Sequence, residues 1–215
     1  MDFGLTEEQS ILQQSARSMV EQEIRPVLAA HDPDRPLPKA AMLKIYGVLA
    51  REGLTAPRLS EEAGGSGMKM LDYGLVFEQL PTAIAISLLS HECTVARIYA
   101  DSDAEQRKRF LPDLIAGRKI CCTGTTEPDT GSDPRGVRTR AVESDGKLVI
   151  NGRKMWITNG TASDLMIATC SMGQGEKGNI LRRIVVERDV SPYEALEIQG
   201  LGLKQGHLSE ILLEI

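Results

Sequence analysis

The residues of this chain best suited to chemistry lie close to position 156. Trp156 is the only tryptophan in the sequence, and Thr158 follows it two residues later. If residues 153–158 form a strand, both side chains project from one face, about 7 Å apart, and Met155 and Ile157 project from the other. A flat ring beside a hydroxyl group suits a planar heterocycle. Trp and Thr are also common strand formers that simply pack, so the pair alone is compatible with an ordinary strand.

A second polar segment begins at Thr126, about 30 residues earlier in the chain. The Thr126 hydroxyl can face a ligand, and Gly131 and Ser132 can offer backbone N–H groups and a hydroxyl to an anion. The alternative is a purely structural turn, stabilised by the side chains of Asp129 and Asp133 through bonds to their own backbone. The segment taken alone favours the structural interpretation.

The other polar motifs predict no catalytic centre. Residues 64–67 are rich in glycine, but they follow no predicted strand and lack the lysine of a phosphate-binding loop. His91 and His207 have no catalytic partner nearby in the sequence, which predicts exposed or hydrogen-bonded histidines. The spacing of His, Cys, Asp and Glu predicts neither a nucleophilic triad nor a metal site.

Composition excludes several classes of protein. The 215 residues carry a net charge of -5, which argues against a basic surface for nucleic acid. The longest apolar run, residues 83–89, is too short to span a bilayer, and the N-terminus resembles no signal peptide. The cysteines form no C-x-x-C pair, which predicts reduced thiols in a cytoplasmic protein rather than disulfides or zinc ligands: Cys93, Cys121, Cys122 and Cys170.

The first half of the chain has helical periodicity. Thr6 and Gln9 are spaced as a capping box at a helix start, and Pro26 is expected to end or kink that helix. A second helix is predicted over 39–52, with Gly53 as its C-terminal cap.

Two further helical stretches follow. Residues 72–92 form an apolar segment that Pro81 interrupts. Ser102 and Glu105 are spaced as another capping box, ahead of a helix over 106–116.

The pattern changes near residue 119 to short strands and turns. Asn151–Gly152, between strands predicted at 147–150 and 153–158, is a strong hairpin signal. Further strands are predicted at 165–170, 180–186 and 209–215. We therefore expect an α+β protein: an all-α helical domain over 1–118 and a small antiparallel β-barrel or sandwich domain over 119–215.

Taken together, these segments resemble the acyl-CoA dehydrogenase family. The two polar motifs, in this order and spacing, are the most specific part of the resemblance. It extends over nearly the whole chain, through residues 5–9, 64–67, 73–80, 105–107, 110–112, 126–128, 131–133, 151–152, 154, 156–160, 201–203 and 209–210.

The resemblance implies FAD as the cofactor and a role for each residue. Thr158 would bond flavin N5, Trp156 would pack against the isoalloxazine, and Ile157 would belong to the same cofactor-binding strand. Thr126 would lie at the pyrimidine end of the ring. Gly131 and Ser132 would contact the flavin pyrophosphate, and Ser132 would also contact the acyl-CoA substrate.

The implied reaction is dehydrogenation of an acyl-CoA thioester to the 2-enoyl-CoA. A carboxylate would remove the α-proton while the β-hydride passes to the flavin, and an electron-transfer flavoprotein would take the electrons. Donors at the thioester oxygen and a dry site would favour the forming enolate. The family also implies a homo-oligomer or a partner subunit.

The chain has a little more than half the length that the resemblance requires, and the part that carries the catalytic glutamate has no counterpart in it. No catalytic residue is assigned, because Glu127 lies in a turn that the family uses structurally. Thr123 stands where relatives have a bulkier side chain near the flavin. We expect the 215-residue chain to be inactive alone and to self-associate through uncovered apolar surface.

The sequence leaves three alternatives to a dehydrogenase open. The chain can be a non-catalytic flavin or acyl-CoA binder, or one subunit of a split enzyme. It can also belong to an oxidase-like enzyme, since acyl-CoA oxidases share much of the pattern. In the third alternative, it is an interaction module with a vestigial flavin face.

Overall fold

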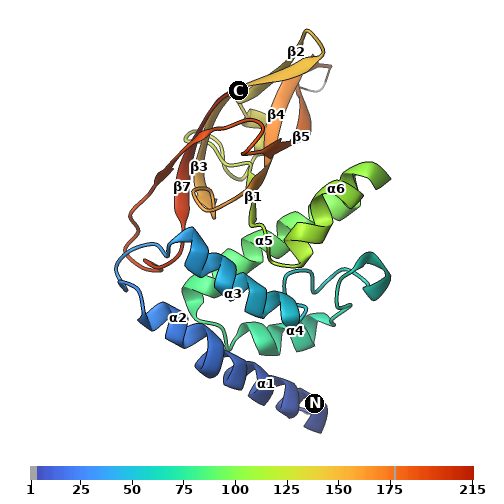
Figure 1. Ribbon diagram of the computed structural model, residues 1–215. Helices are drawn as coiled ribbons and strands as arrows, with labels where there is room; N and C mark the ends of the chain where they lie inside the picture. Colours follow the sequence, from blue (N-terminus) through green and yellow to red (C-terminus); the bar gives the residue numbers. More distant parts are fainter. Residues whose placement is uncertain (1–3, 177) are drawn as a thin grey trace. The chain divides into compact units, whose positions relative to one another are not determined.

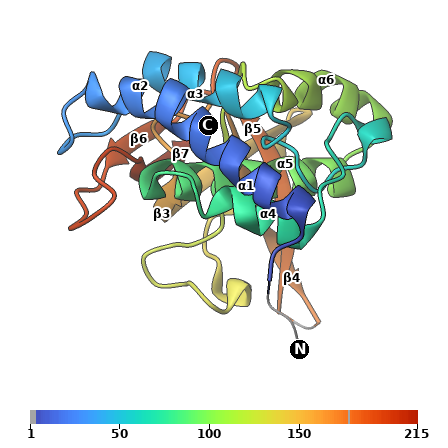
Figure 2. The same cartoon turned by 90° about the horizontal axis from the view of Figure 1, so that it is seen from below.

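The computed structural model describes residues 4–176 and 178–215, and the chain divides into two compact units. The helical unit comprises the chain through Arg118 together with Gly202–Gly206. The β unit comprises Lys119–Leu201 and His207–Ile215. Figure 1 labels most elements of both units, and Figure 2 labels β6.

The described residues of the helical unit form six α-helices. Figures 1 and 2 show them from two directions. Within this unit α1 packs against α4, and α5 packs against α6. The helices are α1 (Glu7–Met19), α2 (Arg25–Ala29), α3 (Lys39–Arg51), α4 (Met70–Phe77), α5 (Thr82–Asp101) and α6 (Ala104–Ile115). Short π and 3-10 turns lie at Val20–Ile24 and Glu61–Ala63.

The capping box at the start of α1 is confirmed. The Thr6 hydroxyl accepts a hydrogen bond from the Gln9 backbone, and the Gln9 side chain accepts one from the Thr6 backbone. The box predicted at Ser102 is wrong by one residue. Asp103 is the cap, because its carboxylate accepts a hydrogen bond from Gln106 N at 2.8 Å, whereas Ser102 ends α5.

Pro26, expected to end or kink the first helical stretch, does not end it, since α2 continues to Ala29. It occupies the first turn of α2, where a missing N–H costs little, and the π turn at Val20–Ile24 precedes it. Gly53 follows α3 with a φ of 70°, the left-handed conformation expected of a C-terminal cap.

His91 is a buried histidine with a hydrogen-bond partner, one of the two outcomes that the sequence predicts. It is fully buried in α5, and its Nε2 lies 3.1 Å from the carbonyl oxygen of Leu114. Its ring meets that of Tyr46 edge-on at 4.9 Å, and the Tyr46 hydroxyl donates to Ser87 O at 3.0 Å. These contacts fix α3, α5 and α6 around one core.

The β unit is a curled, mainly antiparallel sheet, so the α+β fold class is confirmed. The strand order is β1-β4-β2-β3-β7-β6, with β5 also paired to β4. Only β1 and one position of β2 run parallel to β4 among the described strands. The strands are β1 (Cys121–Gly124), β2 (Arg140–Ser144), β3 (Lys147–Thr158), β4 (Leu165–Gly175), β5 (Gly178–Glu187), β6 (Glu194–Glu197) and β7 (Leu208–Glu214).

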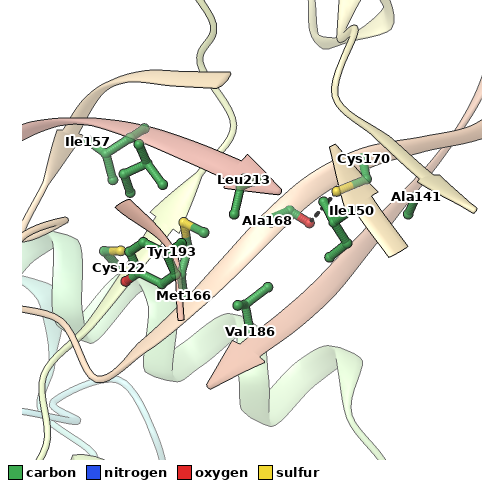
Figure 3. Close-up of a cluster of buried hydrophobic side chains, with 11 residues drawn as sticks. Cys122, Ala141, Ile150, Ile157, Met166, Ala168, Cys170, Val186, Tyr193 and Leu213 are labelled. Carbon is green, nitrogen blue, oxygen red and sulfur yellow. Dashed lines mark hydrogen bonds between the residues drawn. The ribbon is translucent and has the colours of Figure 1, made fainter. Parts of the chain in front are cut away.

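The core of the β unit gathers side chains from most of these strands. Figure 3 shows Ile157, Met166 and Leu213 among its buried residues. Cys122 and Cys170 lie in the same core as free thiols. Burial raises the pKa of Cys122 to about 12 and that of Cys170 to about 11, so both stay protonated at neutral pH.

The predicted hairpin at Asn151–Gly152 is wrong, because β3 runs straight through these residues. The turn lies earlier, at Asp145–Gly146, where both residues have positive φ values of 51° and 72°. Positive φ at both central residues is what a two-residue hairpin of this kind requires, and Asp-Gly provides it as well as Asn-Gly. Gly152 serves close packing instead: an added Cβ would lie 2.3 Å from Thr139 Oγ1.

The substitution Gly152→Ala tests this account of the glycine. We expect it to destabilise the β unit by about 1–3 kcal/mol, because the new methyl group overlaps Thr139 and the sheet must shift. Denaturant unfolding followed by the fluorescence of Trp156 measures this directly. The control is Gly131→Ala, which meets nothing within 4 Å. Equal stability of the two variants would contradict the packing role.

Candidate functional site

Trp156 lies in a β-bulge of β3, a feature that regular alternation did not predict. Lys154 pairs with Ile211 and Ile157 pairs with Ser209, so β3 has one residue more than β7 between these points. Trp156 accommodates the extra residue with a φ of 62°, a left-handed conformation that is uncommon outside glycine.

The bulge decides which side chains face the core. Lys154 and Ile157 lie opposite Ile211 and Ser209, which alternate into the interior of the sheet. The prediction that Met155 shares a face with Ile157 is therefore wrong, since the extra residue reverses the alternation. Ile157 is buried and joins the core in Figure 3, whereas Trp156 is 56 % exposed. Thr158 is partly buried beyond it.

The segment that begins at Thr126 is tied directly to this bulge. Met155 N donates to Thr126 O at 2.9 Å. Glu127 and Thr130 then close a tight turn through two backbone hydrogen bonds of 2.8 and 3.2 Å. The two motifs singled out in the sequence thus adjoin each other in the β unit.

Beyond the turn, Gly131 and Ser132 are exposed. Asp133 bonds the backbone of Arg135 at 3.0 Å, as expected for a structural turn, but Asp129 forms an exposed ion pair with Arg138 instead. Within the described part of the chain, the hydroxyls of Thr126 and Ser132 have no protein hydrogen-bond partner. These groups are available to a ligand.

A buried ion pair lies beneath the bulge. Lys154 Nζ is 2.7 Å from Glu127 Oε1, and the two side chains are 0 % and 5 % exposed. The ammonium group also donates to Thr169 O at 2.6 Å and, more weakly, to Thr125 O at 3.5 Å. All three of its N–H bonds therefore have an acceptor.

The Glu127 carboxylate is equally well satisfied. Besides Lys154, its oxygens accept hydrogen bonds from Thr139 N at 2.9 Å, Thr139 Oγ1 at 2.5 Å and Arg138 N at 2.7 Å. Burial alone would raise the pKa of this carboxyl, but the bonds from Lys154, Thr139 and the backbone outweigh it and lower the pKa. A carboxylate held in this way is a structural anion and a poor base.

Sequence reasoning identified Lys154 and Glu127 only as parts of the family pattern and missed their pairing. The sequence gives little signal for this pairing, because β3 also contains Lys147 and Arg153 and only the fold shows that Lys154 is the buried one. A lysine at an interior position needs a buried carboxylate, and Glu127 is the acidic residue that the Thr126 segment brings to it.

The ionisation of Glu127 is testable by titration. Its folded pKa lies below the ordinary value of 4.5, so its stabilisation is present above that pH and is lost as the pH falls through the folded pKa. We expect the Glu127 side-chain carbon signal in NMR to titrate with a midpoint below 4.5. A midpoint at or above that value would contradict the hydrogen-bond network.

His207 also has partners, as predicted for a satisfied histidine. Its Nδ1 contacts the Glu197 carboxylate and lies 2.8 Å from Thr161 Oγ1. This cluster joins β6 to the segment after β3 and has no free nucleophile. In the described residues no group of His, Cys, Asp or Glu is arranged to hold a metal ion. Among the same residues, each helix is too short or too polar to cross a membrane.

Two family models match consecutive parts of the chain. The model of the acyl-CoA dehydrogenase N-terminal domain matches residues 6–118, and that of the acyl-CoA dehydrogenase middle domain matches residues 122–214.

The chain belongs to the acyl-CoA dehydrogenase family.

Individual relatives support the same assignment. A probable acyl-CoA dehydrogenase of Bacillus subtilis is 32 % identical over 100 % of the chain. The crystal structure of glutaryl-CoA dehydrogenase from Mycobacterium smegmatis has a TM-score of 0.85 and 32 % identity over 98 % of the chain. A second glutaryl-CoA dehydrogenase structure from that organism, in complex with FADH2, has a TM-score of 0.82 and 28 % identity.

The chain spans only part of each relative. It covers 57 % of the Bacillus subtilis protein and 53 % of each glutaryl-CoA dehydrogenase chain. The matched parts are the helical and middle domains, and the C-terminal domain of the family is absent from these 215 residues.

Proposed function

We propose that this chain supplies the helical domain and the flavin-binding face of an FAD-dependent acyl-CoA dehydrogenase. The observation that carries the proposal is the exposed indole of Trp156, held in a left-handed bulge beside the Thr126–Ser132 segment. Among the described residues, the Thr126 and Ser132 hydroxyls of that segment have no protein hydrogen-bond partner. Exposing a tryptophan on a strained backbone is unfavourable in an isolated domain, which favours a ligand as its partner.

The residues fit an anionic planar cofactor. Trp156 offers a flat apolar surface to the isoalloxazine ring, and Thr158 and Thr126 offer hydroxyls to its heteroatoms. Gly131 lacks a side chain and has open space around it, so its backbone can approach a phosphate closely, and Ser132 adds a hydroxyl donor for the pyrophosphate or for acyl-CoA. Ile157 contributes its backbone, because its side chain is committed to the core.

FAD, when bound, supplies the redox chemistry by accepting the hydride that leaves the β-carbon of the thioester. The residues of this chain then act by position: they orient the ring, shield it from water on one side and bond its polar edge. An acyl-CoA is the proposed substrate and an electron-transfer flavoprotein the proposed electron acceptor. A homo-oligomer or a partner subunit is the proposed assembly.

Flavin binding can be followed through Trp156 itself. We expect added FAD to quench the fluorescence of the single tryptophan in a saturable manner, because the indole packs on the ring. Asp129→Asn is the matched control for an altered turn, since it removes only an exposed ion pair and should leave quenching unchanged. Quenching that rises linearly with FAD and never saturates would count against a binding face.

The purified 215-residue chain should not oxidise acyl-CoA. None of the residues proposed to contact the flavin can remove the α-proton of the substrate. Glu127, the buried carboxylate next to Thr126, already accepts hydrogen bonds from Lys154, Thr139 and Arg138. After anaerobic mixing with FAD and butyryl-CoA for several hours, the flavin absorbance at about 450 nm should show no decrease above the limit of detection. Stoichiometric bleaching would show that a base is present in this chain.

A further inference from the structure

The proposed function leaves one buried network beside the bulge without a role: the one formed by Glu127, Lys154, Thr139 and their backbone partners. It will be called the Glu127–Lys154 network. We propose that its role is to position the flavin face by locking the Trp156 bulge to the Thr126 turn. The proposal rests on the proposed function, and it assigns Glu127, Lys154 and Thr139 as positioning residues.

The Glu127–Lys154 network connects the two segments that form the flavin face. Lys154 immediately precedes the bulge on β3, and Glu127 immediately follows Thr126 in the turn. Their 2.7 Å ion pair therefore spans the same two segments as the backbone bond from Met155 N to Thr126 O. A bulge leaves one backbone N–H group of its strand without a partner on the neighbouring strand. Here that group is Met155 N, and Thr126 O accepts its hydrogen bond.

The network also connects β3 to β4 and to the segment just before β2. Lys154 binds the carbonyl of Thr169 on β4, and Glu127 binds the backbone N–H groups of Arg138 and Thr139 just before β2. The network thus holds the bulge against β4 and the start of β2, in addition to the pairing of β3 with β7. The backbone that carries the Trp156 side chain is held by these neighbouring segments.

Two glycines make room for the network. A Cβ on Gly124 would lie 3.4 Å from Lys154 Cγ and 2.8 Å from Met166 Sδ. Gly152 allows Thr139 to approach β3, so that the Thr139 hydroxyl reaches Glu127. Apolar residues would stabilise this interior at least as well as ions, so stability alone does not account for the charges.

Four single variants test the proposal in the intact chain without flavin. Lys154→Met and Glu127→Gln each break the ion pair, and Thr139→Val removes one hydroxyl donor while keeping nearly the same shape. Asp129→Asn is the control, because it breaks an exposed ion pair on the same turn. The readouts are hydrogen exchange at the Met155 amide, relative to the β4 amides, and the fluorescence anisotropy of Trp156.

We expect Met155 exchange to accelerate at least about tenfold relative to β4 in the first two variants, together with a fall in Trp156 anisotropy. Thr139→Val should accelerate it by about two- to fivefold, and it serves as the test if the ion-pair variants do not fold. Asp129→Asn should leave both readouts unchanged. A merely stabilising network would accelerate Met155 and the β4 amides equally, and that result would overturn the proposal.

Flavin binding is scored separately in the same variants. If Trp156 loses order and FAD binding weakens in parallel, the positioning role extends to the cofactor. If the network orders Trp156 in the native chain but the chain binds no FAD, the proposed function is overturned. The claim that the network orders the bulge still stands in that case. If FAD binds equally well to Lys154→Met and to the native chain, the positioning claim fails while the proposed function stands.

Discussion

An ammonium group and a carboxylate buried in the same small sheet are costly unless each donor and acceptor finds a partner. In this chain Lys154 and Glu127 meet that condition, and their bonds run to β4, to the turn after β1 and to the backbone ahead of β2. The position of the Trp156 bulge depends on this arrangement. The rest of the β unit supplies the room for it, through glycines where side chains would collide.

The interaction also separates two functions that a carboxylate can perform. Glu127 is an anion with a lowered pKa, fully occupied by donors. It therefore holds the binding face in place and leaves proton abstraction to another group. These 215 residues match the models of the N-terminal and middle domains of the acyl-CoA dehydrogenase family.

Local rules predicted much of the fold from the sequence. The Thr6–Gln9 capping box, the left-handed Gly53 and the change from helices to strands follow from chemistry within a few residues. The hairpin was misplaced because Asn151–Gly152 and Asp145–Gly146 have equivalent turn chemistry. The two sites are distinguished by the pairing of Asn151 with β2 and β7 and by the close approach of Gly152 to Thr139. The bulge at Trp156 could not be predicted from the neighbouring sequence, because it depends on the number of residues in β7, which lies about 50 positions away.

The central claim is that Trp156 and Thr158 together receive an isoalloxazine ring. A crystal structure of the chain soaked or grown with FAD tests it most directly. The account predicts electron density for the ring in contact with the Trp156 indole, with the Thr158 hydroxyl within hydrogen-bonding distance of a ring heteroatom. Density for the flavin elsewhere on the chain, or a Trp156 side chain turned away from a bound ring, would contradict it.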